Sequence, residues 1–554
     1  MKTAAERVFK LREQKLKANG NTKDWPNPDS VEKLVEKLKS GRHFDAPFNA
    51  VDEETFLVGK ADLSKGDKPQ GKLPPPPSVP PTDAPRTVRP VAFTQQPDFG
   101  KELLAAGADP TGKNPSDDAF AKVMYGMSRA ELQKLLDEAA AADEAIWKLH
   151  GTHHDRAKWD AAKQTAEFRD ARAKIDGVMK QILAARDARK AAFADRVKAL
   201  RAAIDAAKKA KEIDKATKLE ADLGAFEASG AGGGNVRVEV PSGMFLLRQP
   251  LYLLGGVSGL WGAGPDKTTL ITDKPIHLIK MHATATVANF TAKGGTVGLA
   301  LTGHDHHFEL GSPTLKSYIA GQDFYAITFR DQTFAGIHVG TDDAAVMGGA
   351  EHDQNKYVGL KFLNTGDYGI YINTGMLDKW LCLHGEFAGQ KKAGIAVKFN
   401  NLIHGCVVGC TFKEIDGPGI DFLGGNPEIA YRPWQAWIDQ CEFIECGNAT
   451  RPAVEHGLAE LSAFTHCKVE TKGKAIAGGY AGSPQVCQDC TIDVKLAAGS
   501  PAVKLRAVRL ISVSRANGHA FKNVTANGPV VFVNDANADN AFFAKTRERS
   551  GKAG

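Results

Sequence analysis

Three consecutive segments of the chain repeat one pattern without gaps: GLKFLNTGDYGIYIN (residues 359–373), HGEFAGQKKAGIAVKFN (384–400) and GCTFKEIDGPGIDFLGG (409–425). A phenylalanine recurs every 25 residues, at Phe362, Phe387 and Phe412. A Gly-Ile pair recurs with the same spacing, its glycines at positions 369, 394 and 419. Two independent marks in one register indicate a structural repeat rather than chance similarity.

The repeat continues less regularly toward the C-terminus. The segments QCEFIECG, HCKVETKG and DCTIDVKL place Phe443, Val469 and Ile492 at the repeated apolar position. A period near 25 residues, with short β-like runs and no helix inside it, is typical of one coil of a parallel β-helix. Stacked coils would bury the apolar columns in one narrow core, and we expect each glycine before the isoleucine to allow a backbone bend.

The cysteines follow the same repeat. All eight lie between Cys382 and Cys490. Four of them stand two residues before the repeated apolar position: Cys410, Cys441, Cys467 and Cys490. Because residues of the same parity on a strand share a face, these thiols should form an internal ladder. Inert packing of free thiols is favoured over a metal site, since no C-x₂-C pair is repeated.

Upstream of the repeat, the stretch NVRVEVPSGMFLLRQPLYLLGGVSGLWGAGPDKTTLI (235–271) alternates short strands with Gly and Pro turns. It resembles the first coils of the pectate-lyase-like superfamily of right-handed β-helices, which show a strand, a Pro-x-Gly-x-aromatic turn, a second strand and then Gly-x-Gly before Thr-Leu. Here Pro241, Gly243 and Phe245 match the turn, Gly262 and Gly264 match the Gly-x-Gly, and residues 269–270 match the Thr-Leu. The resemblance implies the fold, whereas the superfamily spans lyases, hydrolases, epimerases, tailspikes and adhesins.

The segment LLAAGADPTGKNPSDDAFAKVM (103–124) is similar to the lead-in of that superfamily, with Asp109, Gly112 and Asp117 at the matching places. About a hundred residues of helix then intervene before the first coil. This block opens with a capping box at Ser128 and Glu131 and carries an apolar seam at positions 193, 197, 200 and 204. Two interpretations stay open: a trimeric stalk, or a helical hairpin within one chain.

The expected architecture is a mainly β protein, a right-handed parallel β-helix with an inserted α-helical hairpin or coiled coil and a small N-terminal helical segment. Nine prolines between Gly66 and Pro90 indicate a semi-rigid linker after that segment. The expected divisions are an N-terminal helical anchor (1–63), a Pro-rich linker (64–92), the N-terminal cap of the β-helix (93–127), the helical insertion (128–229), the β-helix (230–540) and a C-terminal tail (541–554).

Charge and hydropathy narrow the class of partner. The formal net charge of +6 is small for 554 residues and is spread along the chain, which argues against nucleic acid. No apolar run is long enough for a membrane span, and the charged N-terminus MKTAAERVFKLREQKLKANG has no apolar region of a secretory signal. We therefore expect a virion-associated protein if the gene belongs to a phage, and a cytoplasmic one otherwise.

Candidate sites fall where a coil is longer than its neighbours. One such long coil lies between the repeat positions Phe412 and Phe443 and contains the segment GNPEIAYRPWQAWIDQ. Aromatic rings stack on sugars and charged groups bond to hydroxyls, so this insertion predicts carbohydrate contact. The substrate-binding candidates are Tyr431, Arg432, Trp434 and Trp437. The carboxylates Asp416, Asp421 and Glu428 are candidates for the acid and base of glycosidic hydrolysis.

The segment between Phe329 and Phe362 contains a second acidic cluster. In it, Asp342 and Asp343 are catalytic candidates, and His352 and Asp353 follow them in sequence. This cluster could bind a divalent cation such as Ca²⁺, which β-elimination by pectate lyases requires; no other cofactor is expected. The motif TGHDHHFELG, with histidines at 304, 306 and 307, is better read as an exposed polar strand than as a metal site. No metal ligands are therefore assigned.

The series of motifs that marks the polygalacturonase branch, which includes Asn-Thr-Asp, is not found. Asn373-Thr374 is followed by Gly375 rather than by an acid. The favoured function is a polysaccharide-recognising spike, resembling a phage tailspike or an adhesin, with or without depolymerase activity and as a possible homotrimer. The alternatives are a monomeric cellular polysaccharide lyase or glycoside hydrolase, and a non-catalytic scaffold that docks a partner through its helical insertion.

Overall fold

The computed structural model describes residues 99–150, 156–228, 231–301, 318–340, 351–353, 355–378, 380–422, 434–448, 451–455, 463–471, 474–477, 485–488, 490–494, 503–508, 519–522, 525–527, 530–535 and 547–548. The expected anchor (1–63) and linker (64–92) lie outside these residues. The chain divides into two compact units. The N-terminal unit contains Thr94–Ile327, and the C-terminal unit contains Thr328–Val339 and Glu351–Gly554.

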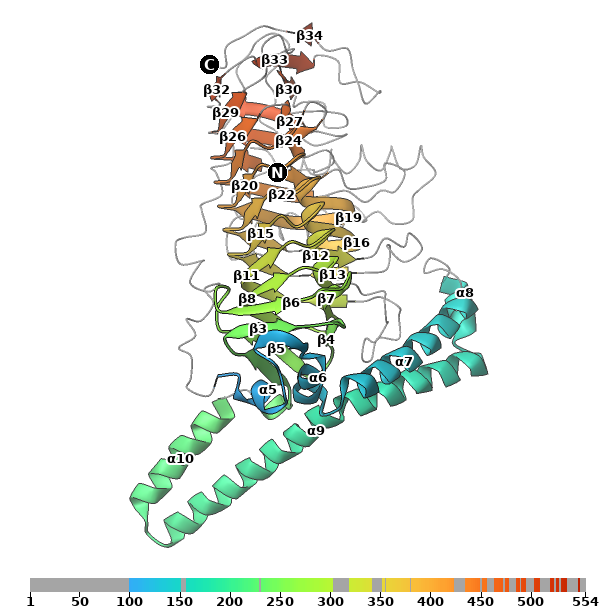
Figure 1. Ribbon diagram of the computed structural model, residues 1–554, viewed down its shortest axis with the longest axis vertical. Coiled ribbons are helices and arrows are strands. Elements are labelled where there is room, and N and C mark those ends of the chain that lie inside the picture. The colour runs from blue at the N-terminus through green and yellow to red at the C-terminus, as the bar shows by residue number, and fades with distance from the viewer. Residues whose placement is uncertain are drawn as a thin grey trace, which may run out of the picture. The chain divides into compact units, whose positions relative to one another are not determined.

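The N-terminal unit combines helices with the first coils of a β-helix (Figure 1). Its elements are α5 (Lys101–Ala105), β1 (Thr111–Pro115), α6 (Asp117–Tyr125), α7 (Arg129–His150), α8 (Arg156–Ala162), α9 (Ala166–Lys209), α10 (Ile213–Ala228), the 3₁₀ helix η3 (Ala231–Gly233), β2 (Val236–Val240), β3 (Gly243–Leu246), β4 (Leu251–Leu253), β5 (Val257–Gly262), β6 (Thr268–Ile271), β7 (His277–Met281), β8 (Thr286–Lys293), β9 (Val297–Leu301), β10 (Tyr318–Ala320) and β11 (Asp323–Arg330), which runs into the C-terminal unit.

In the N-terminal unit, corresponding strands of successive coils pair in parallel and form three stacks, each of which is called a file. Strand β2 pairs with β5 and β5 with β8, β3 pairs with β6 and β6 with β8, and β4 pairs with β7 and β7 with β9. Each strand thus bonds to a strand of the next coil rather than to its neighbour in sequence. This pattern is that of a parallel β-helix, as the repeat and the opening stretch predict.

A cap covers the first coil. Strand β1 pairs in parallel with β3, so the lead-in segment adds an outer strand to the file. Phe120 of α6 meets Phe245 edge-on, with ring centroids 6.5 Å apart. The hydroxyl of Tyr125 donates to the carbonyl of Tyr252 and accepts from the backbone N–H of Leu254. The helix therefore seals the apolar end of the core and satisfies backbone groups there.

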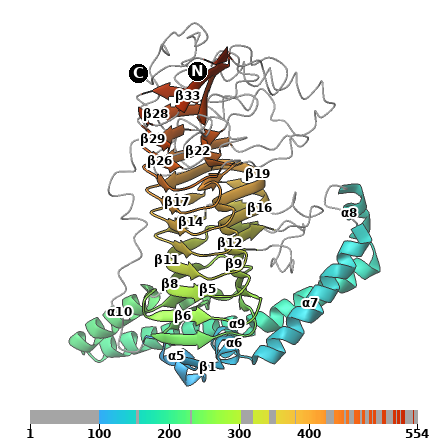
Figure 2. The same ribbon diagram turned by 45° about the horizontal axis from the view of Figure 1, so that its top comes forward.

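The helical insertion folds back on itself within one chain. Helix α9 is 44 residues long, and Thr165 caps its N-terminus by accepting from the backbone N–H of Phe168. Helices α7 and α10 both pack against α9, along different parts of its length (Figures 1 and 2). The predicted seam contacts α10, where Phe193 stacks on Phe226 at 4.5 Å. Its apolar side chains are thus used by an intrachain hairpin.

The C-terminal unit holds the remaining coils. Its elements are β12 (Ala335–Gly340), β13 (Glu351–Asp353), β14 (Lys356–Val358), β15 (Lys361–Leu363), β16 (Tyr368–Asp378), β17 (Leu381–Leu383), β18 (Glu386–Ala388), β19 (Ala393–Val408), β20 (Thr411–Lys413), β21 (Ile420–Asp421), β22 (Trp434–Asp439), β23 (Glu442–Ile444), β24 (Pro452–Glu455), β25 (Ala463–Thr465), β26 (Lys468–Thr471), β27 (Lys474–Ala477), β28 (Gln485–Gln488), β29 (Thr491–Val494), β30 (Val503–Val508), β31 (His519–Lys522), β32 (Thr525–Asn527), β33 (Val530–Asp535) and β34 (Arg547–Glu548).

The predicted phenylalanine column is confirmed. Strands β15, β18, β20, β23, β26 and β29 form one parallel file, in which the register joins Phe362, Phe387, Phe412, Phe443, Val469 and Ile492 in that order. The rings of Phe362, Phe387, Phe412 and Phe443 stack at 4.6–4.8 Å. Each ring is fully buried, so successive coils share one continuous aromatic core.

The explanation expected for the repeated glycines is wrong. Glycines 369, 394 and 419 do not adopt the left-handed backbone conformation that a permissive bend would require. Instead, a Cβ at Gly394 would lie 2.6 Å from the Phe412 ring and 2.6 Å from the carbonyl oxygen of Gly419. The glycine is required because the phenylalanine of the next coil occupies the space of a side chain.

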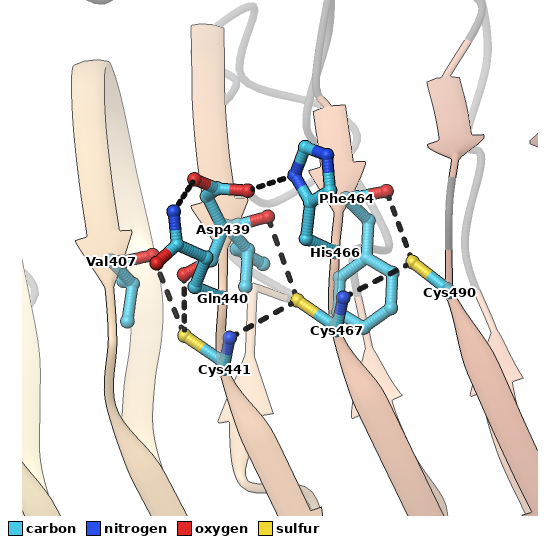
Figure 3. A network of polar contacts seen from close by, with 9 residues as sticks. Val407, Asp439, Gln440, Cys441, Phe464, His466, Cys467 and Cys490 are labelled. Atoms are coloured by element: carbon cyan, nitrogen blue, oxygen red, sulfur yellow. Dashed lines mark hydrogen bonds and ion pairs between the residues drawn. The ribbon is translucent and has the colours of Figure 1, made fainter. Parts of the chain in front are cut away.

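The predicted thiol ladder is present. Cys410, Cys441, Cys467 and Cys490 are at most 2% exposed, and all six cysteines described with side chains are free thiols. Figure 3 shows the last three on neighbouring strands, where the backbone N–H of each residue approaches the next sulfur: Cys441 to Cys467 and Cys467 to Cys490, both at 3.4 Å. The ladder packs beside the aromatic column as small apolar side chains do.

Candidate functional site

Many of the sequence candidates lie outside the described residues. They are Asp342, Asp343, Glu428, Tyr431, Arg432 and the histidines at 304, 306 and 307. Trp434 and Trp437 belong to β22, and His352 and Asp353 to β13, but only the strand positions of these four are described. Asp416 and Asp421 are the catalytic candidates whose side chains can be placed.

Asp421 is a buried carboxylate on the strand that precedes the long insertion. Its register partners are Ala396 on one side and Glu455 on the other. The side chain is fully buried, and Arg451 Nη2 donates to Asp421 Oδ2 at 2.7 Å. The guanidinium of Arg451 is 29% exposed, so the ion pair joins a buried anion to a cation at the surface.

Asp416 lies near the same ion pair. Its carboxylate accepts a bond of 3.3 Å from Asn448 Nδ2, and Asn448 Oδ1 accepts from the backbone N–H of Arg451. Asn448 and Arg451, both of the following coil, therefore each hold one of the two candidate carboxylates. Both candidate carboxylates are thus engaged in bonds within the protein.

Phe334, His338, Tyr368 and Tyr371 pack together and are called here the aromatic shelf; the register joins Tyr371 through Ala396 to Asp421. The ring of Tyr371 lies 5.2 Å from both Phe334 and His338, and 4.7 Å from Tyr368. Tyr371 stands between Ile370 and Ile372, which are fully buried, so strand alternation directs it to the outer face. Ala393 and Ala396 of the next coil pack against the shelf because they leave room for the rings.

Charged side chains border the aromatic shelf. Lys392 Nζ lies 2.7 Å from Asp367 Oδ2 and 5.7 Å from the ring centroid of Tyr368. Burial raises the pKa of the Tyr368 hydroxyl; Lys392 and Arg451 act in the opposite direction, and Asp367 and Asp421 add to the rise. These four charges therefore act on one phenol, which places the aromatic shelf and the Asp421–Arg451 pair in one electrostatic environment.

A second buried acid, Asp439, was not identified from the sequence. It ends β22, the strand that follows the long insertion, and its side chain is fully buried. Asp439 Oδ1 lies 2.8 Å from Nδ1 of His466 on the next coil, and Gln440 Nε2 donates to Asp439 Oδ2 at 3.2 Å (Figure 3). The His466 side chain is 35% exposed, so the buried carboxylate orients an imidazole at the surface.

The two buried acids flank the insertion in the sequence. Asp421 precedes residues 423–433 and Asp439 follows them, and each bonds to a basic side chain of the following coil. Arg451 and His466 are partly exposed, so these side chains, rather than the fully buried acids, can donate to a polyhydroxylated ligand. Among the side chains that the structure describes, no group of three or more His, Cys, Asp or Glu is arranged to hold a metal ion.

No helix in the described part of the chain combines the length and the apolar character of a membrane span.

Comparisons with known proteins give few matches. No family model matches the sequence, and no curated protein matches it. Solved structures that resemble it include a GH87 alpha-1,3-glucanase catalytic domain in complex with tetrasaccharides, with 12% identity and a TM-score of 0.29 over 53% of this chain and 60% of that one. Another is the catalytic unit of a thermostable GH87 alpha-1,3-glucanase from Streptomyces thermodiastaticus, with 14% identity and a TM-score of 0.21 over 52% of this chain and 62% of that one.

The chain thus spans about three fifths of the length of these structures. At such TM-scores the likeness carries no argument about activity or substrate, and the strand pairing itself establishes that the chain is a parallel β-helix protein.

Proposed function

We propose that the protein recognises a polysaccharide, and that the aromatic shelf of the C-terminal unit is part of the binding surface. The observation that carries the proposal is the shelf itself: the partly buried rings of Phe334 and Tyr371, packed on buried aromatic rings and bordered by Lys392, Asp367 and the Asp421–Arg451 pair. Sugar rings offer an apolar C–H face and a polar rim of hydroxyls. The shelf offers surfaces for both.

The β-helix suits a long polymer because its outer face repeats from coil to coil. His338, Tyr371, Ala396 and Asp421 belong to successive coils of the C-terminal unit. Parallel neighbours are spaced by about 4.8 Å, so four coils present roughly 15 Å of surface along the stacking direction, enough for several sugar units. Solenoid proteins in general use such extended surfaces for binding.

Within this proposal, the chain is related to the pectate-lyase-like superfamily and acts as a tailspike-like or adhesin-like protein. The lead-in segment supports the relationship, because Pro110 packs closely on Gly243. A Cβ added to Gly243 would lie 2.7 Å from Pro110. The Pro-x-Gly-x-aromatic turn and the lead-in are thus parts of one packed cap. A homotrimer belongs to the same proposal, and light scattering on the full-length protein measures it.

Cleavage of the polysaccharide is a separate question for the same surface. Asp416 and Asp421 are the catalytic candidates whose side chains are described, and hydrolysis would need one as acid and the other as base or nucleophile. The direct test incubates the protein with each bound glycan and follows reducing ends, unsaturated products and chain length. Unsaturated products that disappear on chelation would identify a lyase that uses a divalent cation.

Binding is tested with a glycan array of bacterial and plant polysaccharides, probed with the fluorescently labelled full-length protein. The proposal expects retention of a restricted group of glycans and weaker retention of the same group by the Tyr371→Ala variant. The matched control is Trp261→Ala, which removes a partly buried aromatic ring of the N-terminal unit. Equal retention of all three proteins would remove the shelf from the binding surface.

A further inference from the structure

An open groove in the N-terminal unit is unrelated to the aromatic shelf. It has a volume of about 820 Å³ and runs along the first half of α7 beside Gln249. Its polar lining consists of Arg129, Gln133, Lys134, Asp137, Glu138 and Gln249. Residues 129, 133 and 137, and residues 130, 134 and 138, follow each other at intervals of four, so they share one side of the helix.

Arg129 is the unusual residue of this groove. It is only 9% exposed, although it carries a full positive charge. Its backbone is fixed by the capping box of Ser128 and Glu131 and by a bond from its own N–H to Asp118 Oδ1. The guanidinium lies 5.4 Å from the ring centroid of Tyr252, which covers one of its faces.

The hydrogen bonds of the Arg129 guanidinium are incomplete. Nη2 donates to Gln133 Oε1 at 2.9 Å. Nε and Nη1 are buried and have no hydrogen-bond partner among the residues that the structure describes. A guanidinium carries five N–H donors in a fixed plane, so most of its donor capacity is unused.

No carboxylate of the described residues forms an ion pair with Arg129, although Asp117 and Asp137 act on its charge from a distance. Asp117 accepts from the backbone N–H groups of Arg248 and Gln249, and Asp137 accepts from Gln133 Nε2 at 2.6 Å. Burial lowers the pKa of Arg129, as expected for a cation removed from water. A buried cation without a hydrogen-bonded anion is costly, so the unused donors of Arg129 favour a ligand that brings a negative charge.

We propose that this groove binds a small carboxylic acid that also carries hydroxyl groups, with Arg129 as the residue that receives its carboxylate. Arg129 and Lys134 balance Asp137 and Glu138, so the lining is electrically neutral and favours a singly charged carboxylate over a doubly charged phosphate. The amides of Gln133 and Gln249 and the two acids supply donors and acceptors for hydroxyls. The volume lies within the range of about 300–1,000 Å³ found for small-molecule sites.

A second, much smaller cavity provides the competing explanation. It measures about 10 Å³ and is lined by Arg129, Asp117, Tyr125 and Tyr252 among others. A cavity of about 10–15 Å³ holds one water, which could accept from the unused donors. In that case the guanidinium would be satisfied internally, and the groove would show no preference for an acid.

The test is calorimetric titration of the full-length protein with sodium gluconate. Sorbitol is the matched neutral probe, because it has the same carbon chain with an alcohol in place of the carboxylate; inorganic phosphate is the second anion. We expect gluconate to bind, and sorbitol and phosphate to bind at least tenfold more weakly. Binding of gluconate no tighter than that of sorbitol would overturn the proposal, and tighter binding of phosphate would overturn the assignment of a carboxylate.

Variants locate the site. Arg129→Gln should weaken gluconate binding at least tenfold, and Arg129→Lys should recover only part of it because the planar fork is lost. The control is Lys148→Gln at the far end of α7, which should leave binding unchanged. Should Arg129→Gln fail to fold, the ¹⁵Nε resonance of Arg129 in the wild-type protein replaces it: a shift with gluconate and none with sorbitol supports the site, and no shift overturns it. The result is independent of glycan binding by the aromatic shelf.

Discussion

Asp439 Oδ1 and His466 Nδ1 lie 2.8 Å apart, although 27 residues separate them in sequence and only one coil separates them in space. The carboxylate is fully buried, and the imidazole reaches the surface. His466 therefore bonds to a carboxylate that the fold has removed from water, and this carboxylate ends the strand that follows residues 423–433.

We expect His466→Ala to lower the free energy of unfolding by about 2 kcal/mol, because it leaves a buried carboxylate without one of its partners. His384→Ala is the matched control, since His384 occupies the equivalent turn of an earlier coil with the same left-handed backbone and is exposed. Urea unfolding followed by circular dichroism measures both. Equal effects of the two substitutions would show that the bond to Asp439 contributes nothing specific.

The repeated glycines give a second prediction. Gly394→Ala should destabilise the protein by about 2–3 kcal/mol, because the new methyl group would overlap the Phe412 ring. Gly177→Ala is the control: it lies within α9 with no atom within 4 Å of the added Cβ, and there alanine should stabilise by about 0.5–1 kcal/mol. A neutral Gly394→Ala variant would mean that the coils can separate without cost.

The buried thiols predict a dependence of stability on alkaline pH. Burial raises the pKa of Cys446 from 9.0 to about 12, so between these values the folded chain keeps a proton that the unfolded chain releases. Stability from this thiol is complete below pH 9 and is lost as the pH rises toward 12, by about 1.4 kcal/mol per pH unit.

The measurement is the free energy of unfolding of wild type and Cys446→Ala as a function of pH under reducing conditions. Above pH 9 the wild-type curve should fall more steeply, by the equivalent of one proton. Parallel curves would contradict a buried, protonated Cys446.

The long insertion gives a prediction that comes from the sequence. Replacing Trp434 and Trp437 with alanine should weaken glycan binding without unfolding the protein, because two rings that could stack on sugars would be lost from β22. Binding is measured on the glycans that the wild-type protein retains, and folding by circular dichroism. Unchanged binding would exclude this strand from the glycan surface.

The fold could be predicted because its determinants are periodic. Phe362, Phe387 and Phe412, which recur every 25 residues in the sequence, are register partners on neighbouring strands. The alternation of side chains along a strand was enough to predict that the cysteines lie in the core. The role of the glycines was predicted wrongly, because a glycine required for space and one required for backbone conformation look alike in a sequence.

The candidate site was predictable only in part. Asp421 and Asp416 were identified because they flank an insertion, but their partners Arg451 and Asn448 depend on how the next coil packs. Asp439 and His466 were missed because coils of unequal length hide their alignment. A signal for the aromatic shelf was present: Tyr368 and Tyr371 stand 25 residues before Ala393 and Ala396, so large rings face small side chains of the next coil.

The most direct test of the central claim is affinity electrophoresis of wild type, Tyr371→Ala and Trp261→Ala through gels that contain a polysaccharide selected by the glycan array. If the aromatic shelf binds glycan, wild type and Trp261→Ala are retarded equally, and Tyr371→Ala migrates at least partly free while remaining folded. If folded Tyr371→Ala is retarded as strongly as wild type, the polysaccharide binds elsewhere and the proposed role of the shelf is wrong.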